Sequence, residues 1–122
     1  MKKIVSQLAD VKPYLTKDQS MIYELMHPAQ QGNTAQSLAM AVVPPGVTTL
    51  RHKHLQSEEI YYVLSGKGRL FLDHENWLVG EGDSVCILPG QCHQIENTGT
   101  QDLKIFCCCS PAYSHDDTVL MT

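Results

Sequence analysis

The sequence lacks the features expected of a protein that binds nucleic acid or spans a membrane. Its 9 lysines and arginines form no basic block, and the formal net charge is −4. Nucleic-acid-binding domains carry clustered basic residues, so no such partner is expected. No apolar run approaches the roughly 20 residues of a membrane-spanning helix. The polar residues that follow Ile4 leave no signal-peptide core. We therefore expect a cytoplasmic protein.

The sequence also lacks a cysteine framework. It has 5 cysteines but no CxxC pair, which argues against a thiolate zinc site. Cys107, Cys108 and Cys109 are consecutive, and neighbours on a strand point to opposite faces, so they do not form a disulfide framework. We interpret the cysteines as small buried apolar residues. The alternative is a redox or active-site role, for which Cys92 beside His93 is the best candidate.

Helix signals are scarce as well. Short apolar stretches are separated by turn sequences such as Pro44-Pro45-Gly46, which is typical of an all-β sandwich or barrel. The length of 122 residues fits one domain. Residues 1 to about 32 give the weakest structural signal, and we expect this segment to form an edge strand or a dimer arm. Strands are expected at residues 20–26, 35–43, 48–54, 59–64, 69–73, 77–79, 84–88, 91–97 and 103–110.

Three histidines and one carboxylate stand in a pattern that favours metal binding. His52 and His54 are two residues apart, so on a strand they share a face with Thr48 and Leu50. Glu59 begins the next apolar run, and His93 follows a proline-glycine turn. Imidazoles with one carboxylate suit borderline first-row metals, and such a set leaves positions open for water or substrate.

The spacing of these residues resembles the two motifs of the cupin family over about residues 36–110. The first motif, G(x)5HxH(x)3–4E(x)6G, is matched at every spacing by Gly46, His52, His54, Glu59 and Gly66. Glu58 is an alternative carboxylate, but only Glu59 leaves six residues before Gly66.

The second motif, G(x)5PxG(x)2H(x)3N, is matched with one departure. Its usual first proline is replaced by Leu88, with Pro89 in the position beside it. The matching residues are Gly82, Gly90, His93 and Asn97.

This resemblance implies a small single-domain cupin, with the fold of a double-stranded β-helix or jelly-roll barrel. The single domain would span residues 1–122, with a core at about 36–110, an N-terminal arm at 1–35 and a tail at 111–122. The family implies a homodimer and one divalent transition metal, which is iron, manganese, nickel, zinc or copper. Its ligands in this chain would be His52, His54, Glu59 and His93.

The resemblance leaves the activity open. A metal-dependent enzyme of dioxygenase, isomerase or decarboxylase type, acting on a small polar metabolite, is the first hypothesis. A non-catalytic sugar-binding, small-molecule-binding or sensor protein is the second, and a purely structural metal or an empty barrel is the third. Tyr61 is a weak catalytic candidate. Its hydroxyl could contact substrate, but we favour the alternative that the side chain simply packs in the core. We expect His27 and His74 to be solvated, and we give His115 and Asp117 only a small chance of a site role.

Overall fold

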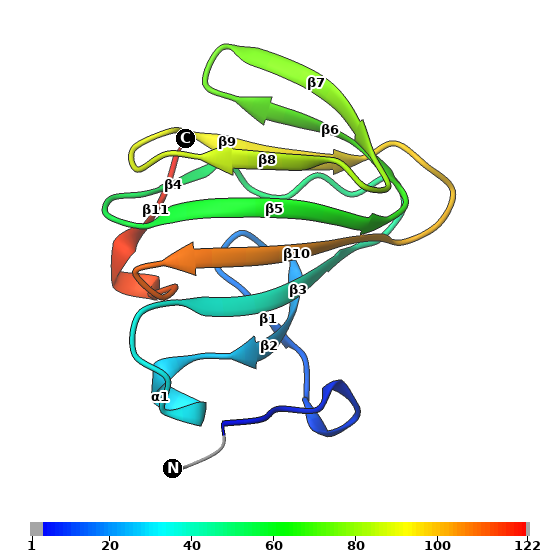
Figure 1. The fold of residues 1–122 in the computed structure, drawn as a ribbon. Helices are drawn as coiled ribbons and strands as arrows, with labels where there is room; N and C mark the ends of the chain where they lie inside the picture. Colours follow the sequence, from blue (N-terminus) through cyan, green and yellow to red (C-terminus); the bar gives the residue numbers. More distant parts are fainter. Residues whose placement is uncertain (1–3, 122) are drawn as a thin grey trace.

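The computed structural model describes residues 4–121 and consists almost entirely of two antiparallel sheets (Figure 1). The six-stranded sheet contains, in spatial order, β1 (Tyr14–Leu15), β2 (Met21–Met26), β3 (Ser37–Val43), β10 (Leu103–Ser110), β5 (Glu58–Ser65) and β8 (Ser84–Ile87). The five-stranded sheet contains β11 (Thr118–Leu120), β4 (His52–His54), β9 (His93–Asn97), β6 (Lys67–Leu72) and β7 (Glu75–Gly80). The expected all-β jelly-roll barrel is confirmed.

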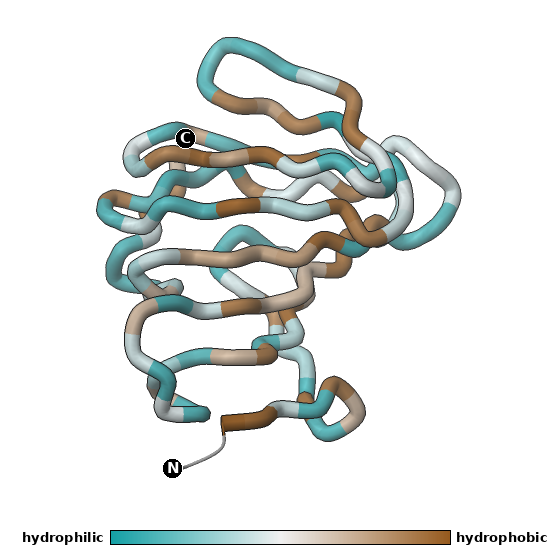
Figure 2. The backbone as a smooth tube through the Cα atoms, viewed as in Figure 1, coloured by the Kyte–Doolittle hydropathy of each residue, from teal (hydrophilic) through white to brown (hydrophobic). Residues whose placement is uncertain are grey.

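The core lies between the two sheets because the strands alternate apolar and polar residues. On β5 the side chains of Glu59, Tyr61 and Val63 are buried, while Ile60 and Tyr62 point outward, as period two requires. Figure 2 shows hydrophobic residues concentrated on the strands and hydrophilic residues in connections such as the one between β9 and β10. The core cluster includes Val43, Val63, Leu70, Ile87, Ile95, Leu103 and Ile105.

Helical structure is limited to short turns. These are η1 (Leu8–Asp10), α1 (Pro28–Gln31) and η2 (His115–Asp117). Within the described residues, no helix has the length and apolar character needed to cross a bilayer. The expectation that His27 is solvated was wrong, because its Nδ1 caps α1 by accepting from the Ala29 amide and its Nε2 lies 2.8 Å from the Tyr113 carbonyl oxygen.

The N-terminal arm belongs to the six-stranded sheet. β2 pairs with β3 along most of its length, and β1 pairs with β2 at the edge. Of the two expectations for the N-terminal arm, its described residues show the edge strand. The arm therefore forms part of the barrel wall.

The approach to β4 differs from the sequence-based expectation. Thr48 and Leu50 are exposed and do not share the buried face of His52 and His54, because regular pairing begins only at His52. The Leu50 amide donates to the carbonyl of Asp18 in the N-terminal arm, and Thr49 takes the inward position. The contact with the arm interrupts the alternation that the sequence suggested.

Two motif glycines have clear structural roles. Gly66 has φ +93°, and a Cβ there would lie 2.7 Å from the Asp102 carbonyl oxygen, so only glycine fits between β5 and β6. This turn is also tighter than expected, since β6 already begins at Lys67. Gly90, with φ +86°, donates its amide to the His54 carbonyl at 2.7 Å. That bond holds the turn before β9 against β4.

Candidate metal centre

The two motifs meet where β4 and β9 pair. His52 lies opposite His93 in the antiparallel register, and His54 is two residues along β4. One ring nitrogen from each of the three histidines lies within 4.8 Å of the others. All three side chains are buried, with at most 4% of their surface exposed. The sheet therefore brings together the three histidines that the sequence predicted to share a site.

Backbone carbonyls orient two of the rings. His52 Nδ1 lies 2.9 Å from the Leu50 carbonyl oxygen, and His93 Nδ1 lies 3.1 Å from the Gln91 carbonyl oxygen. A carbonyl oxygen only accepts hydrogen bonds, so each Nδ1 carries the proton. The Nε2 atoms of these rings are left with a free lone pair, which is the form that binds a metal.

A threonine from the tail orients the third ring. The Thr118 hydroxyl donates to the Ser114 carbonyl at 2.9 Å, so its oxygen is free to accept from His54 Nδ1 at 3.0 Å. Thr118 lies opposite His54 because β11 pairs with β4. The tail residues therefore hold His54 in the same tautomer as the other two histidines.

Glu59 completes the cluster from the opposite sheet. Its Oε1 lies 3.2 Å from His54 Nε2 and 3.4 Å from His93 Nε2. Its Oε2 accepts a hydrogen bond from the Cys109 thiol at 3.3 Å. Burial alone would raise the pKa of Glu59, but hydrogen bonding from His54 and the close approach of His93 outweigh burial and lower the pKa to about 2. This lowering applies when the two Nε2 atoms carry protons, which a bound metal would displace.

This donor set fits a cation. Three Nε2 lone pairs and one carboxylate converge in a buried space, and such groups repel one another unless a cation or protons lie between them. Among the described residues, His93 Nε2 is buried without a hydrogen-bond partner. Burial lowers the pKa of His52, and the neighbouring His93 lowers it further. Both effects disfavour the protonated His52 ring.

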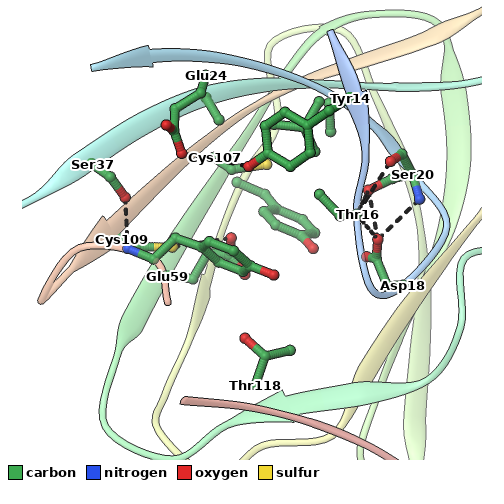
Figure 3. Close-up of a pocket in the computed structure, with 15 residues that line it drawn as sticks. Tyr14, Thr16, Asp18, Ser20, Glu24, Ser37, Glu59, Cys107, Cys109 and Thr118 are labelled. Atoms are coloured by element: carbon green, nitrogen blue, oxygen red, sulfur yellow. Dashed lines mark hydrogen bonds between the residues drawn. The ribbon is translucent and has the colours of Figure 1, made fainter. Parts of the chain in front are cut away.

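A pocket lies beside the cluster, with Glu59, Tyr61 and Thr118 in its wall (Figure 3). Its empty volume is about 570 Å³, which includes open solvent at the mouth of the pocket. The space exists because the inward positions of β3 and β10 at this end of the barrel carry small side chains. These are Ser37, Ala39, Ala41, Cys107 and Cys109.

The N-terminal arm and the tail supply pocket residues that sequence reasoning did not identify. Asp18 and Glu24 come from the arm and lie on different sides of the pocket in Figure 3. Tyr14 and Tyr113 also line it. No local signal marked these residues, since Asp18 occurs in an ordinary turn sequence. The inward position of Glu24 on a predicted strand was the one available clue.

The other sequence-based candidates take different places. Tyr61 packs in the core and also lines the pocket, and burial raises its pKa. Cys107 and Cys109 are buried, as the apolar interpretation expected. That interpretation was wrong for Cys86, which is exposed, and Cys92 and Cys108 are half-buried. The Asp117 carboxylate accepts from the amides of residues 56 and 57 and so anchors the tail. His115 is exposed, and its Nδ1 lies 3.1 Å from the Tyr113 hydroxyl.

Comparison with known proteins agrees with this architecture. The model of the cupin domain matches residues 39–109. An uncharacterized protein of Methanocaldococcus jannaschii is 50% identical over 121 residues, covering 99% of this chain and 97% of that protein. The oxalate-binding protein of Thermotoga maritima is 37% identical over 81 residues, covering 66% of this chain and 63% of that protein.

Solved structures show the same barrel. The crystal structure of a predicted oxalate decarboxylase from Thermotoga maritima matches with a TM-score of 0.77 at 26% identity, covering 88% of this chain and 98% of that one. The Streptomyces protein PAC13 with uridine matches with a TM-score of 0.82 at 16% identity, covering 99% of this chain and 92% of that one. At 16% identity the second likeness concerns the fold alone. The domain match, the jelly-roll barrel and the histidine cluster agree, and this chain belongs to the cupin family.

Proposed function

We propose that this cupin is a metal-dependent enzyme that acts on a small polar metabolite. A divalent transition metal, which is iron, manganese, nickel, zinc or copper, would be held by His52, His54, Glu59 and His93. The observation that carries the proposal is the convergence of three oriented Nε2 atoms and a buried carboxylate beside a pocket. When bound, such a metal polarises an oxygen atom of the substrate or lowers the pKa of bound water.

The residues around the cluster would position the substrate and exclude water. The side chains of Ile22, Ala39 and Ala41 give the pocket an apolar side. Asp18 and Glu24 place carboxylates in the pocket wall. Either one could act as a general base and accept a proton from a substrate bound within hydrogen-bonding distance. Two such carboxylates favour the isomerase type, because they can accept protons but would repel the carboxylate that a decarboxylase acts on.

The second candidate is a non-catalytic protein that binds a small molecule, with the metal as an anchor. It is supported by the Thermotoga maritima relative named as an oxalate-binding protein, whereas the carboxylates in this chain's pocket favour a ligand other than oxalate. The two candidates share the metal site and differ only in turnover, so one set of measurements separates them.

The metal site is tested by purifying the protein without a histidine tag and measuring bound metals by mass spectrometry. We expect one equivalent in the wild type and nearly none in His52→Ala and His93→Ala. His74→Ala is the control, because His74 is an exposed histidine in the turn between β6 and β7 and should keep the metal. Equal metal content in all four proteins would reject the site.

Turnover is tested on the metal-loaded protein with a panel of small hydroxylated and carboxylated metabolites. Conversion seen by NMR without oxygen uptake would support the isomerase or decarboxylase type, and oxygen uptake would support a dioxygenase. Tight ligand binding without conversion would favour the non-catalytic candidate.

We also propose that two copies of the chain pair through the outer face of the six-stranded sheet. On β5 this face exposes Ile60, Tyr62 and Leu64 to 45%, 43% and 38%. Phe106 and Cys108 of β10 lie directly beside Tyr62 and Ile60. This face carries few charged residues, so a charged partner would find little electrostatic complementarity there. A second copy of the same apolar face would bury the exposed side chains of both. Light scattering should show a dimer that Tyr62→Glu converts to a monomer, and a monomeric wild type would exclude it.

A further inference from the structure

The pocket beside the metal centre is acidic. Its wall contains the carboxylates of Asp18, Glu24 and Glu59. Among the described residues that line it, none is lysine or arginine. Three carboxylates exceed the charge of a divalent metal by one, so the pocket keeps a negative charge even with the metal bound.

Asp18 is held so that one of its oxygens stays available. Its Oδ1 accepts from the Thr16 hydroxyl, from the Ser20 amide at 3.0 Å and from the Ser20 hydroxyl at 2.6 Å. Its Oδ2 lies 3.7 Å from His52 Nδ1, the nitrogen of that ring that points away from the metal cluster. Figure 3 shows this carboxylate at the edge of the pocket, fixed by Thr16 and Ser20. The geometry leaves Oδ2 as an acceptor oxygen in the wall of the pocket that Glu59 also lines.

Glu24 reaches the pocket from β2. It lies opposite Ala39 of β3 in the antiparallel register, and the short alanine side chain leaves space in front of the carboxylate. The Tyr14 hydroxyl lies 3.5 Å from Glu24 Oε2, which is a long contact. A ligand with hydroxyl or ammonium groups would supply the hydrogen-bond donors that these acceptors lack.

We propose that the pocket selects neutral or cationic ligands that carry hydroxyl or ammonium groups, and that it discriminates against dicarboxylates. Asp18 and Glu24 are the specificity-determining residues. The position of the ligand beside the metal rests on the proposed function. The negative charge of the pocket wall does not depend on the metal. At an effective dielectric constant of about 20, a unit of ligand charge roughly 12 Å from a carboxylate changes affinity on the order of tenfold, and a closer charge changes it by more.

The test uses a matched four-carbon series that differs in charge. The probes are L-tartrate, L-threitol and 4-amino-4-deoxy-L-threitol, titrated by calorimetry into the metal-loaded and metal-free protein at pH 7.5. We expect both forms to bind the amine and threitol more tightly than tartrate. In the metal-free form no metal charge offsets the three carboxylates, so its preference for the amine should be the stronger of the two.

Charge-removing variants identify the residues responsible. In Asp18→Asn and in Glu24→Gln, the disadvantage of tartrate relative to threitol should shrink about tenfold. Glu75→Gln removes the same charge from an exposed strand position and should leave the ratio unchanged. Circular dichroism checks folding, and if Asp18→Asn does not fold, Glu24→Gln alone carries the test.

The proposal is overturned if tartrate binds the wild type more tightly than threitol, or if neither variant changes the ratio by more than threefold. It is also overturned if threitol and its amine do not bind at all. Failure of the proposed metal site would appear separately, as absence of metal in the loaded sample. The series in the metal-free protein would then still decide the selectivity.

Discussion

The role of the tail in the metal site is tested by replacing Thr118 with valine. Valine has nearly the shape of threonine but lacks the hydroxyl that accepts from His54 Nδ1 and donates to the Ser114 carbonyl. Both Thr118 and His54 are buried, so water cannot easily replace the lost bonds. The variant therefore removes the orientation of His54 without removing a metal ligand.

The expected loss follows from these two hydrogen bonds. A buried polar group left without its partner costs about 1–3 kcal/mol. Without the acceptor at Nδ1, the His54 tautomer protonated at Nδ1 is no longer favoured. More of the ring then carries its proton at Nε2, which makes Nε2 less available to a metal. Loss of such an orienting partner typically weakens metal binding about 10- to 100-fold.

The assay is competition for zinc or manganese against a fluorescent chelator at pH 7.5, with wild type, Thr118→Val and Thr118→Ser. Serine keeps the hydroxyl, so Thr118→Ser should bind within about threefold of the wild type, whereas Thr118→Val should bind at least about tenfold more weakly. The melting temperature of metal-free Thr118→Val should also fall, by about 3–8 °C. Unchanged affinity in Thr118→Val would refute the idea that the tail orients His54.

Three further predictions follow from particular contacts. Glu59→Gln should reduce metal affinity, because an amide is a weaker ligand than a carboxylate, whereas the outward-facing Glu58→Gln should not; the same chelator competition measures both. Gly66→Ala should destabilise the fold by about 2 kcal/mol more than Gly82→Ala in urea unfolding. Both glycines have positive φ, but only at Gly66 would a Cβ meet backbone within 3 Å, so equal losses would contradict the packing argument. Burial raises the pKa of Tyr113 to about 12, so the folded state favours the neutral phenol, and the stability this contributes is complete below pH 10 and is lost as the pH rises toward 12. Absorbance at alkaline pH should show one fewer late-titrating tyrosine in Tyr113→Phe.

Period-two patterning predicted much of the fold. The alternation of Glu59, Tyr61 and Val63 placed the correct face of β5 inward, and the glycine and proline turns separated the strands near their observed positions. These signals are local, because a strand's two faces are distinguished by neighbouring residues alone. The same argument failed at Thr48 and Leu50. A hydrogen bond from Leu50 to the distant Asp18 interrupts the alternation there, and no local pattern records that contact.

The candidate ligands were likewise found from spacing. His52 and His54 share a face because they are two residues apart, and the motif spacing singled out Glu59 and His93. Asn97, the last residue of the second motif, has a structural part: its side-chain amide donates to the Val43 and Gln101 carbonyls. The motif thus contains both a candidate ligand and a residue that holds the barrel together.

What the sequence determined by itself is the all-β class, the family resemblance and the four candidate ligands, because each depends on residues close in the chain or at set intervals. What only the tertiary structure decided is the surroundings of those ligands. Thr118 reaches the site because β11 pairs with β4, across 64 positions of the chain. Asp18 and Glu24 reach it from the N-terminal arm, which packs against β3 and the approach to β4. Side chains from the two ends meet in one pocket because the barrel closes, and that closure is a property of the whole chain.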